Sequence, residues 1–198
     1  MKVKLPVKKL DLGCGLEKVD GADGLDMIDL PGLKYKHDMN RFPYPIKPNT
    51  YDEIHCYHIL EHVDDVIRVM EEVYRIGKHN AKIYIRSPHA SCSKVLWADP
   101  THKRAFSTRT FIEYFSSGGR WSYYTKANFH LENMKINYTF DSNSRIPRVM
   151  SWFLTYIANI NLFSQELCER LWANWFGGFE EISVILRVNK SNKSASSL

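Results

Sequence analysis

Short apolar runs alternate with polar stretches along the first half of the chain. Runs at 7–12, 24–28, 33–37, 51–57 and 81–85 have the length of strands, and turn-forming residues separate several of them. A helical pattern lies between the last two runs. This alternation predicts an α/β fold with a largely parallel sheet.

Helical spacing is clearest after the fourth strand. Apolar residues at three- and four-residue intervals predict an amphipathic helix over 63–76, with Gly77 as its cap. The residues in this pattern are Val63, Val66, Ile67, Met70, Val73 and Tyr74. A second, short helix is predicted over 107–115.

The last third of the chain has a different pattern. Segments 129–140 and 179–188 read as two long strands, and no further strand–helix–strand unit joins them, which predicts an antiparallel sheet edge. Segment 145–178 between them holds Trp152, Trp172 and Trp175, and it is apolar on too many sides for an isolated surface helix. We expect a helical lid over a substrate cleft or a dimer contact, and peripheral membrane contact through 149–176 is the alternative.

Composition fits one globular domain. The 198 residues are 44% hydrophobic and 25% charged, so we expect a single domain over 1–189 and a disordered Lys/Ser/Asn tail over 190–198. The net charge of +5 includes four lysines within the first nine residues, but no basic run follows, so nucleic-acid binding is not expected. Four cysteines without C-x-x-C spacing indicate free thiols, and no stretch predicts a signal peptide or a transmembrane helix, which favours the cytoplasm.

The most informative stretch is Leu-Asp-Leu-Gly-Cys-Gly at residues 10–15, where the first predicted strand ends. Gly13 and Gly15 can take left-handed backbone angles and let the chain approach a ligand closely. Asp11 can accept hydrogen bonds or pair with a cation at the end of the strand. A glycine turn followed by a later acidic residue is typical of dinucleotide sites, although the same letters also fit an ordinary turn.

Four stretches together resemble the class I methyltransferases that use S-adenosylmethionine (SAM). They are LDLGCG, GLDMIDLPGLKYKHDMNRFPYP, YDEIHCYHILEHVDD and ADPTHKRAFS, which cover roughly residues 10–115. They are particularly similar to a small subgroup associated with polysaccharide and glycan assembly. The resemblance implies a Rossmann-like seven-stranded, mostly parallel sheet with an antiparallel last strand. It also implies helices on both faces and a helical insertion before the last strand.

The same resemblance implies a set of cofactor-binding residues. Asp26 corresponds to the acid that takes the ribose hydroxyls, and Asp38 to the acid that accepts from the adenine amino group. The full set is Asp11, Gly13, Cys14, Gly15, Asp26, Met27, Asp38, Met39 and His58. Segment 16–25 is too short for the usual helix between strands, so we expect a loop there, and Asp29 competes with Asp26 for the ribose.

Chemistry is expected at the carboxyl ends of the fourth and fifth strands. Methyl transfer to a hydroxyl needs alignment and removal of a proton, and histidine is a suitable base near neutral pH. In the loop over 87–106, His102 is the leading candidate, and Asp99 could orient its ring. His89 and His58 are alternatives. Asp99-Pro100-Thr101 also fits a turn or a helix cap, and His58 also fits a simple packing role.

Residues 58–62 also match a zinc-peptidase pattern. His58, Glu61 and His62 form H-x-x-E-H, but zinc would need both histidines on one helix face and a third ligand. His58 is predicted at a strand end and not on the helix, which argues against zinc. Magnesium would need a cluster of acidic ligands, and Asp64, Asp65 and Asp99 do not make a persuasive octahedral set. We therefore expect no metal in this protein.

The resemblance favours SAM-dependent O-methylation of a sugar hydroxyl in glycan or polysaccharide biosynthesis, with S-adenosylhomocysteine as the product. A small-molecule N- or O-methyltransferase is the nearest alternative. A non-catalytic SAM-binding module of a larger glycan-assembly protein is an alternative from another class. The expected partner is a glycan or small-molecule acceptor, and a homodimer or a fusion to other glycan-synthesis domains is compatible with the sequence.

Overall fold

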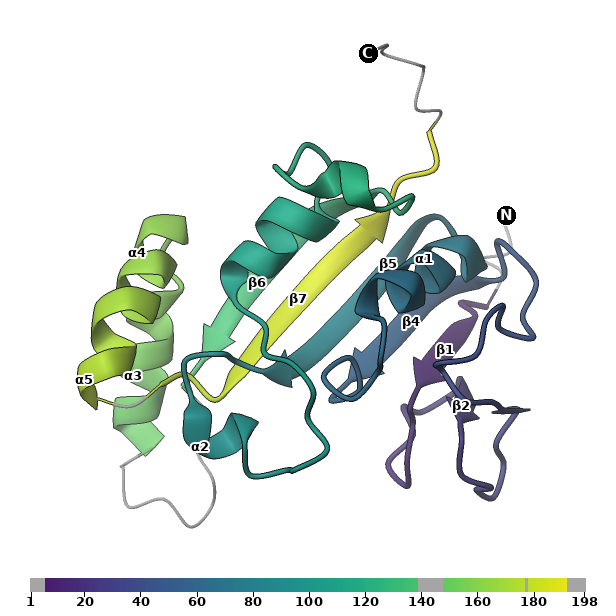
Figure 1. The fold of residues 1–198 in the computed structure, drawn as a ribbon, viewed down its shortest axis with the longest axis horizontal. Coiled ribbons are helices and arrows are strands. Elements are labelled where there is room, and N and C mark those ends of the chain that lie inside the picture. Colours follow the sequence, from purple (N-terminus) through teal and green to yellow (C-terminus); the bar gives the residue numbers. More distant parts are fainter. Residues whose placement is uncertain (1–5, 139–147, 177, 192–198) are drawn as a thin grey trace.

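The computed structural model describes residues 6–138, 148–176 and 178–191. Seven strands form one sheet in the order β3-β2-β1-β4-β5-β7-β6, in which β7 runs antiparallel to both neighbours (Figure 1). The strands are β1 (Lys9–Leu12), β2 (Ala22–Asp26), β3 (Tyr35–Lys36), β4 (Tyr51–Tyr57), β5 (Gly77–Pro88), β6 (Phe129–Asn137) and β7 (Glu181–Val188). The predicted α/β fold with a mostly parallel sheet and an antiparallel edge is confirmed.

Burial alternates along the central strands, so the two faces of the sheet differ in character. On β5, Ile83 and Ile85 are buried, whereas Tyr84 is half-buried and Arg86 is exposed. β7 repeats the pattern from Ile182 onward, with every second side chain in the core. Period-two burial means that one face carries the hydrophobic core and the other is polar and aromatic.

Helix α1 (Val66–Ile76) covers the apolar face. Its Val69, Met70, Val73 and Ile76 side chains are completely buried. The helix begins three residues later than predicted, because the Asp65 carboxylate accepts hydrogen bonds from the N–H groups of Ile67 and Arg68. Gly77 caps the other end as predicted, and β5 begins at that residue without an intervening loop.

The remaining helical elements are short. A π-helical turn, η1 (Thr110–Phe115), replaces the helix predicted over 107–115 and buries Phe111 and Phe115 in the core. The others are α2 (Ser93–Leu96), the 3₁₀ turn η2 (Ser122–Tyr124), α3 (Arg148–Ala158), α4 (Leu162–Leu167), the π-helical turn η3 (Cys168–Trp172) and α5 (Ala173–Phe176).

Helices are unevenly distributed over the sheet in the described part of the chain. With right-handed crossovers, the connections that lead from β1 to β2 and β3 lie on one face of the sheet. The connection that leads from β4 to β5, on the other side of β1, lies on the opposite face. The β4-to-β5 crossover contains α1, but segments 13–21 and 27–34, which would cover the second face, contain no helix. Among the described helices, α1 and η1 lie on the apolar face and α3 lies against β6. The loop predicted between Gly15 and Asp26 is thus present, and its shortness leaves the second face open.

Helices α3 and α4 protect the free edge of the sheet. The Asn159 side chain, just after α3, accepts from the Ile136 N–H at 2.9 Å and donates to the Ile136 carbonyl at 2.7 Å. Thr155 Oγ1 accepts from the Tyr138 N–H, and the Gln165 amide donates to the Met134 carbonyl. These side chains take the place of a neighbouring strand and block edge-to-edge pairing.

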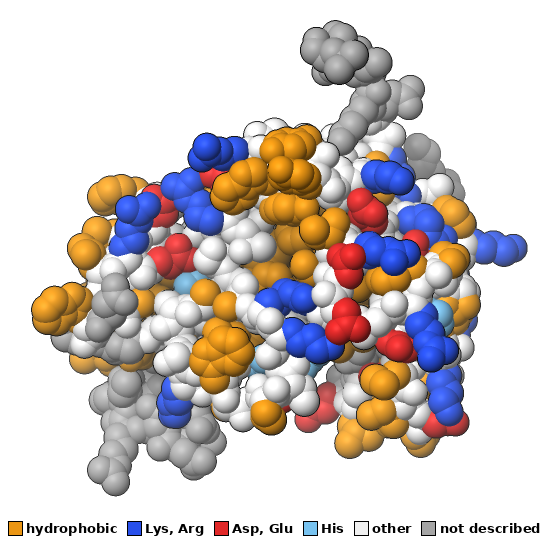
Figure 2. Space-filling model, in the orientation of Figure 1, with side chains coloured by type: hydrophobic (Ala, Val, Ile, Leu, Met, Phe, Trp, Pro, Cys, Tyr) orange, Lys and Arg blue, Asp and Glu red, His pale blue; other side chains and the backbone are white. Residues whose placement is uncertain are grey.

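Segment 145–178 does not sit over the carboxyl ends of β1 and β2 as a lid. Its described helices lie at the opposite end of the molecule from these strands (Figure 1). Apolar side chains gather over this end in the space-filling view, and Trp152, Phe163 and Trp175 are exposed (Figure 2). No helix in the described part of the chain is long and apolar enough to cross a membrane.

The first residue of the predicted disordered tail is bonded to the folded domain. The Lys190 ammonium donates to the Gly77 carbonyl at 2.6 Å and to the Arg75 carbonyl at 3.1 Å, so residues 190 and 191 belong to the folded domain. Residues 192–198, which were also predicted to be disordered, lie outside the described residues.

Replacing Asn159 by alanine should lower the free energy of unfolding by about 1–3 kcal/mol, because both backbone groups of Ile136 lose their partner at the sheet edge. Urea unfolding followed by circular dichroism measures the change. Asn133→Ala is the matched control, since Asn133 is exposed on β6, the strand that carries Ile136. An equal loss in both variants would show that Asn159 does not protect the edge.

Candidate functional site

The turn after β1 depends on two glycines in left-handed conformation. Gly13 has φ +64° and Gly15 has φ +50°. A Cβ at position 13 would lie 2.4 Å from Cγ1 of Ile59, a residue that follows β4. At position 15 the same atom would meet nothing within 4 Å. Gly13 thus lets two neighbouring strand ends pack closely, whereas Gly15 leaves space for a ligand.

Two buried aspartates hold this turn in place. Asp11 accepts from the Val19 N–H at 2.8 Å, and Asp26 accepts from the Gly15 N–H at 2.9 Å. Burial raises the pKa of Asp11 above its ordinary value, against the opposing effect of the Val19 hydrogen bond. Asp29 instead points away as an exposed partner of Lys36 at 2.9 Å. The structure therefore brings Asp26, and not Asp29, to the glycine turn.

The other predicted cofactor residues lie in the segments that follow β1, β2 and β3. Asp38 follows β3, and its Oδ1 accepts from the Asn40 N–H at 2.9 Å. Met39 is buried in the core, whereas Met27 is 64% exposed. Cys14 is buried, and together with Gly15, Leu16, Lys18, Leu30, Pro31 and Leu33 it lines a cavity of about 340 Å³.

His58 is held in a strained conformation at the end of β4. Its φ of +50° is rare for a residue with a side chain, and such strain clusters at functional sites. His58 Nε2 lies 3.1 Å from Glu181 Oε2, and Nδ1 lies 3.6 Å from Glu61 Oε1. The hydrogen bond to Glu181 and the nearby Glu61 carboxylate raise the pKa of His58 to about 9, so the ring is a cation at neutral pH.

Glu181, at the start of β7, is the anionic partner in this group. Burial alone would raise its pKa, but hydrogen bonds from His58 and Arg86 and the Arg86 charge outweigh burial and hold the pKa at about 2. Arg86 Nη2 lies 2.6 Å from Glu181 Oε2.

His102 lies beside a carboxylate that the sequence analysis named only as part of the H-x-x-E-H pattern. The Glu61 side chain is completely buried, and its Oε2 accepts from Ser87 Oγ at 3.0 Å. His102 Nε2 lies 4.0 Å from Glu61 Oε1, while Nδ1 faces the Leu96 carbonyl. The expected Asp99–His102 pair is not formed: Asp99 caps a turn by accepting from both the N–H and the hydroxyl of Thr101.

His89 occupies a different environment from the other histidines. Only 1% of its side chain is exposed, and both ring nitrogens are engaged, with Ser91 Oγ at 2.8 Å and Glu169 Oε1 at 2.7 Å. Glu169 also accepts from the N–H and hydroxyl of Thr108. This network ties η3 to the loops after β5, so the structure gives His89 a packing role and no access to a substrate.

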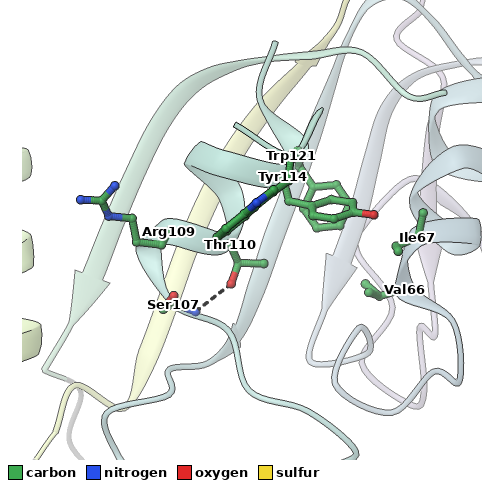
Figure 3. Close-up of a pocket in the computed structure, with 8 residues that line it drawn as sticks. Val66, Ile67, Ser107, Arg109, Thr110, Tyr114 and Trp121 are labelled. Carbon is green, nitrogen blue, oxygen red and sulfur yellow. Dashed lines mark hydrogen bonds between the residues drawn. The ribbon is translucent and has the colours of Figure 1, made fainter. Parts of the chain in front are cut away.

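An apolar groove lies near the start of α1. Val66 and Ile67 of α1 face Tyr114 and Trp121 across it (Figure 3). Its volume is about 310 Å³. Aromatic faces make up much of the opposite wall, which suits a flat organic ligand. The Arg109 guanidinium points away from the groove and pairs with Glu113 and Glu166 (Figure 3).

The comparisons with known proteins agree with this geometry. A family model described as a methyltransferase domain matches residues 28–85. No curated protein matches the chain. A SAM-dependent methyltransferase from Archaeoglobus fulgidus aligns over 93% of this chain and 87% of its own, with 17% identity and a TM-score of 0.55. The YcgJ protein from Bacillus subtilis aligns over 96% and 95%, with 14% identity and a TM-score of 0.55.

The chain has the methyltransferase fold. The same arrangement of elements also occurs in the [4+2]-cyclase SpnF, which aligns over 92% of this chain and 75% of its own with 15% identity and a TM-score of 0.50. The fold therefore does not decide the reaction, which depends on the residues of the site.

Replacing Glu181 by glutamine should reduce the loss of unfolding free energy that the protein shows as the pH falls. The folded-state pKa of Glu181, about 2, lies below its ordinary value of 4.5. Its stabilisation is therefore present above the ordinary value and is lost as the pH falls toward 2. The variant should be less stable by about 1–3 kcal/mol near pH ~6, and the difference should shrink toward pH ~3.

Urea unfolding at several pH values measures this difference. Glu180→Gln removes the same charge one residue away and should keep the acid response of the unmodified protein. A constant difference between Glu181→Gln and the unmodified protein at all pH values would contradict the low pKa.

Proposed function

We propose that this protein is a SAM-dependent methyltransferase whose cofactor lies across the carboxyl ends of β1, β2 and β3. The observation that carries the proposal is the meeting of Gly15 and Asp26 at an edge where family and fold comparisons both point to methyltransferases. SAM supplies the reactive methyl group, so the protein needs only to bind, orient and handle protons.

Each residue at this edge has a role that suits SAM. The Asp26 carboxylate accepts from the ribose hydroxyls in charge-assisted hydrogen bonds. The open space next to Gly15 lets the amino-acid end of the cofactor approach the backbone. Asp38, after β3, takes the adenine amino group.

For the acceptor we propose a sugar hydroxyl in glycan or polysaccharide biosynthesis. The resemblance of the sequence to glycan-associated methyltransferases supports this choice. The groove with Tyr114 and Trp121 supports it as well, because aromatic faces pack against sugar rings. Histidines and Glu61 lie between the end of β4 and the loop after β5, where an acceptor hydroxyl would lose its proton.

Calorimetric titration with SAM and S-adenosylhomocysteine tests the cofactor site. The unmodified protein should bind both with micromolar affinity, and Asp26→Ala should lose at least about 10-fold, because two charge-assisted hydrogen bonds disappear. Asp29→Ala is the matched control and should bind like the unmodified protein. Absence of binding in the unmodified protein would overturn the proposal, and a loss confined to Asp29→Ala would move the ribose contact.

Turnover with a panel of nucleotide sugars and glycans tests the reaction. His102→Ala should keep S-adenosylhomocysteine affinity and lower the rate at least about 100-fold, because loss of a proton-handling group costs this much. Release of S-adenosylhomocysteine measures the rate. Turnover on small aromatic or amine acceptors alone would favour a small-molecule methyltransferase. Tight SAM binding without turnover on any acceptor would favour a non-catalytic module.

A further inference from the structure

One oxygen of a completely buried carboxylate lacks a hydrogen-bond partner. Glu61 Oε2 accepts from Ser87 Oγ, but Oε1 has no hydrogen bond with any described residue. The nearest ring nitrogens are His58 Nδ1 at 3.6 Å and His102 Nε2 at 4.0 Å. The His58 ring is held by Glu181 and does not reach hydrogen-bond distance of this oxygen. Burying a carboxylate oxygen without a bonded partner is costly, so Oε1 is free to bind a ligand directly.

Two imidazoles converge on the same place. Glu61, His62 and His102 each offer a ligand atom, and these atoms lie within 4.8 Å of one another. The rings of His62 and His102 are 4.7 Å apart between centroids. Two histidines and one carboxylate are a common ligand set for first-row transition metals.

Hydrogen bonds determine which ring nitrogen remains free on each histidine. A carbonyl can only accept, so His102 Nδ1 donates to Leu96 and its Nε2 keeps a lone pair in the neutral ring. The Thr101 hydroxyl donates its single proton to Asp99, so it accepts from His62 Nδ1 and leaves His62 Nε2 free as well. Metal-binding histidines usually show this arrangement, in which the second nitrogen donates to an outer acceptor.

The two segments that carry these ligands are joined firmly. The Lys103 N–H donates to the Glu61 carbonyl at 2.8 Å. The Arg104 guanidinium donates to the carbonyls of Leu60, Val63 and Asp64. The loop after β5 is therefore held against the turn after β4, and the three side chains are organised before any ligand arrives.

We propose that Glu61, His62 and His102 bind a divalent first-row transition-metal ion. Three protein ligands leave coordination positions open, and these would take oxygen atoms of the acceptor. With the ion bound, His102 would act on the acceptor hydroxyl through the ion, which lowers the pKa of a bound hydroxyl, and not as a free base. The binding of the ion does not depend on methyl transfer, whereas the acceptor role rests on the function proposed above. The proposal replaces the expectation of a metal-free site: the H-x-x-E-H letters contribute Glu61 and His62, and the third ligand comes from His102, 40 positions beyond His62 in the sequence.

Titration of the tag-free, chelator-treated protein with Co²⁺ and Zn²⁺ tests the site. Calorimetry should give one ion per chain, and Co²⁺ should develop visible absorption bands that Zn²⁺ displaces. Glu61→Gln and His102→Ala should each weaken binding by more than the ~10- to 100-fold that loss of an outer hydrogen-bond partner costs. His130→Ala is the matched control, because His130 is an exposed histidine on β6, and this variant should bind like the unmodified protein.

Circular dichroism and S-adenosylhomocysteine titration of the same variants separate loss of the ion from loss of the fold or the cofactor. No binding of either metal ion by the unmodified protein would overturn the proposal. So would equal affinity in the unmodified protein and in a folded His102→Ala variant. Metal binding without any affinity for S-adenosylhomocysteine would keep the metal site and reject the methyltransferase function.

Discussion

The short connections after β1 and β2 constrain the rest of the molecule. Too few residues lie between these strands for a helix, so among the connections between parallel strands in the described part of the chain, only the one from β4 to β5 contains a helix. The hydrophobic core therefore forms on one face, under α1 and η1. The second face over β4, β5 and β7 stays polar and aromatic, and loops alone shape the edge where the cofactor is proposed to bind.

The sheet ends at β6, and the free backbone groups of this edge strand must be protected from pairing with another chain. The helices α3 and α4 meet this need with side-chain amides and a hydroxyl that pair with the backbone of β6. The same layer reaches the loops after β5 through Glu169, which joins His89 and Thr108. The segment that the sequence suggests as a lid is thus part of the scaffold, and many of its aromatic side chains remain exposed.

The site combines two kinds of constraint at neighbouring strand ends. Around β1 and β2, the carboxylates of Asp11 and Asp26 accept hydrogen bonds from backbone N–H groups of a turn in which Gly13 and Gly15 are left-handed. Around β4 and β5, charged and imidazole groups are packed against a buried carboxylate, and Arg104 holds their loops together. Desolvation makes each of these polar contacts matter more than it would on the surface.

The sequence by itself determined the strands, the main helix and the glycine turn, because these depend on local periodicity and on backbone angles that only glycine adopts easily. It also indicated that a loop replaces the first helix, since residue count limits a crossover. Only the tertiary structure decided the partners of the histidines. His102 faces Glu61, whereas Asp99 caps Thr101 and His89 is buried against Glu169. Such pairings join residues far apart in the chain, and their geometry follows from how strands and loops pack, which no local pattern encodes.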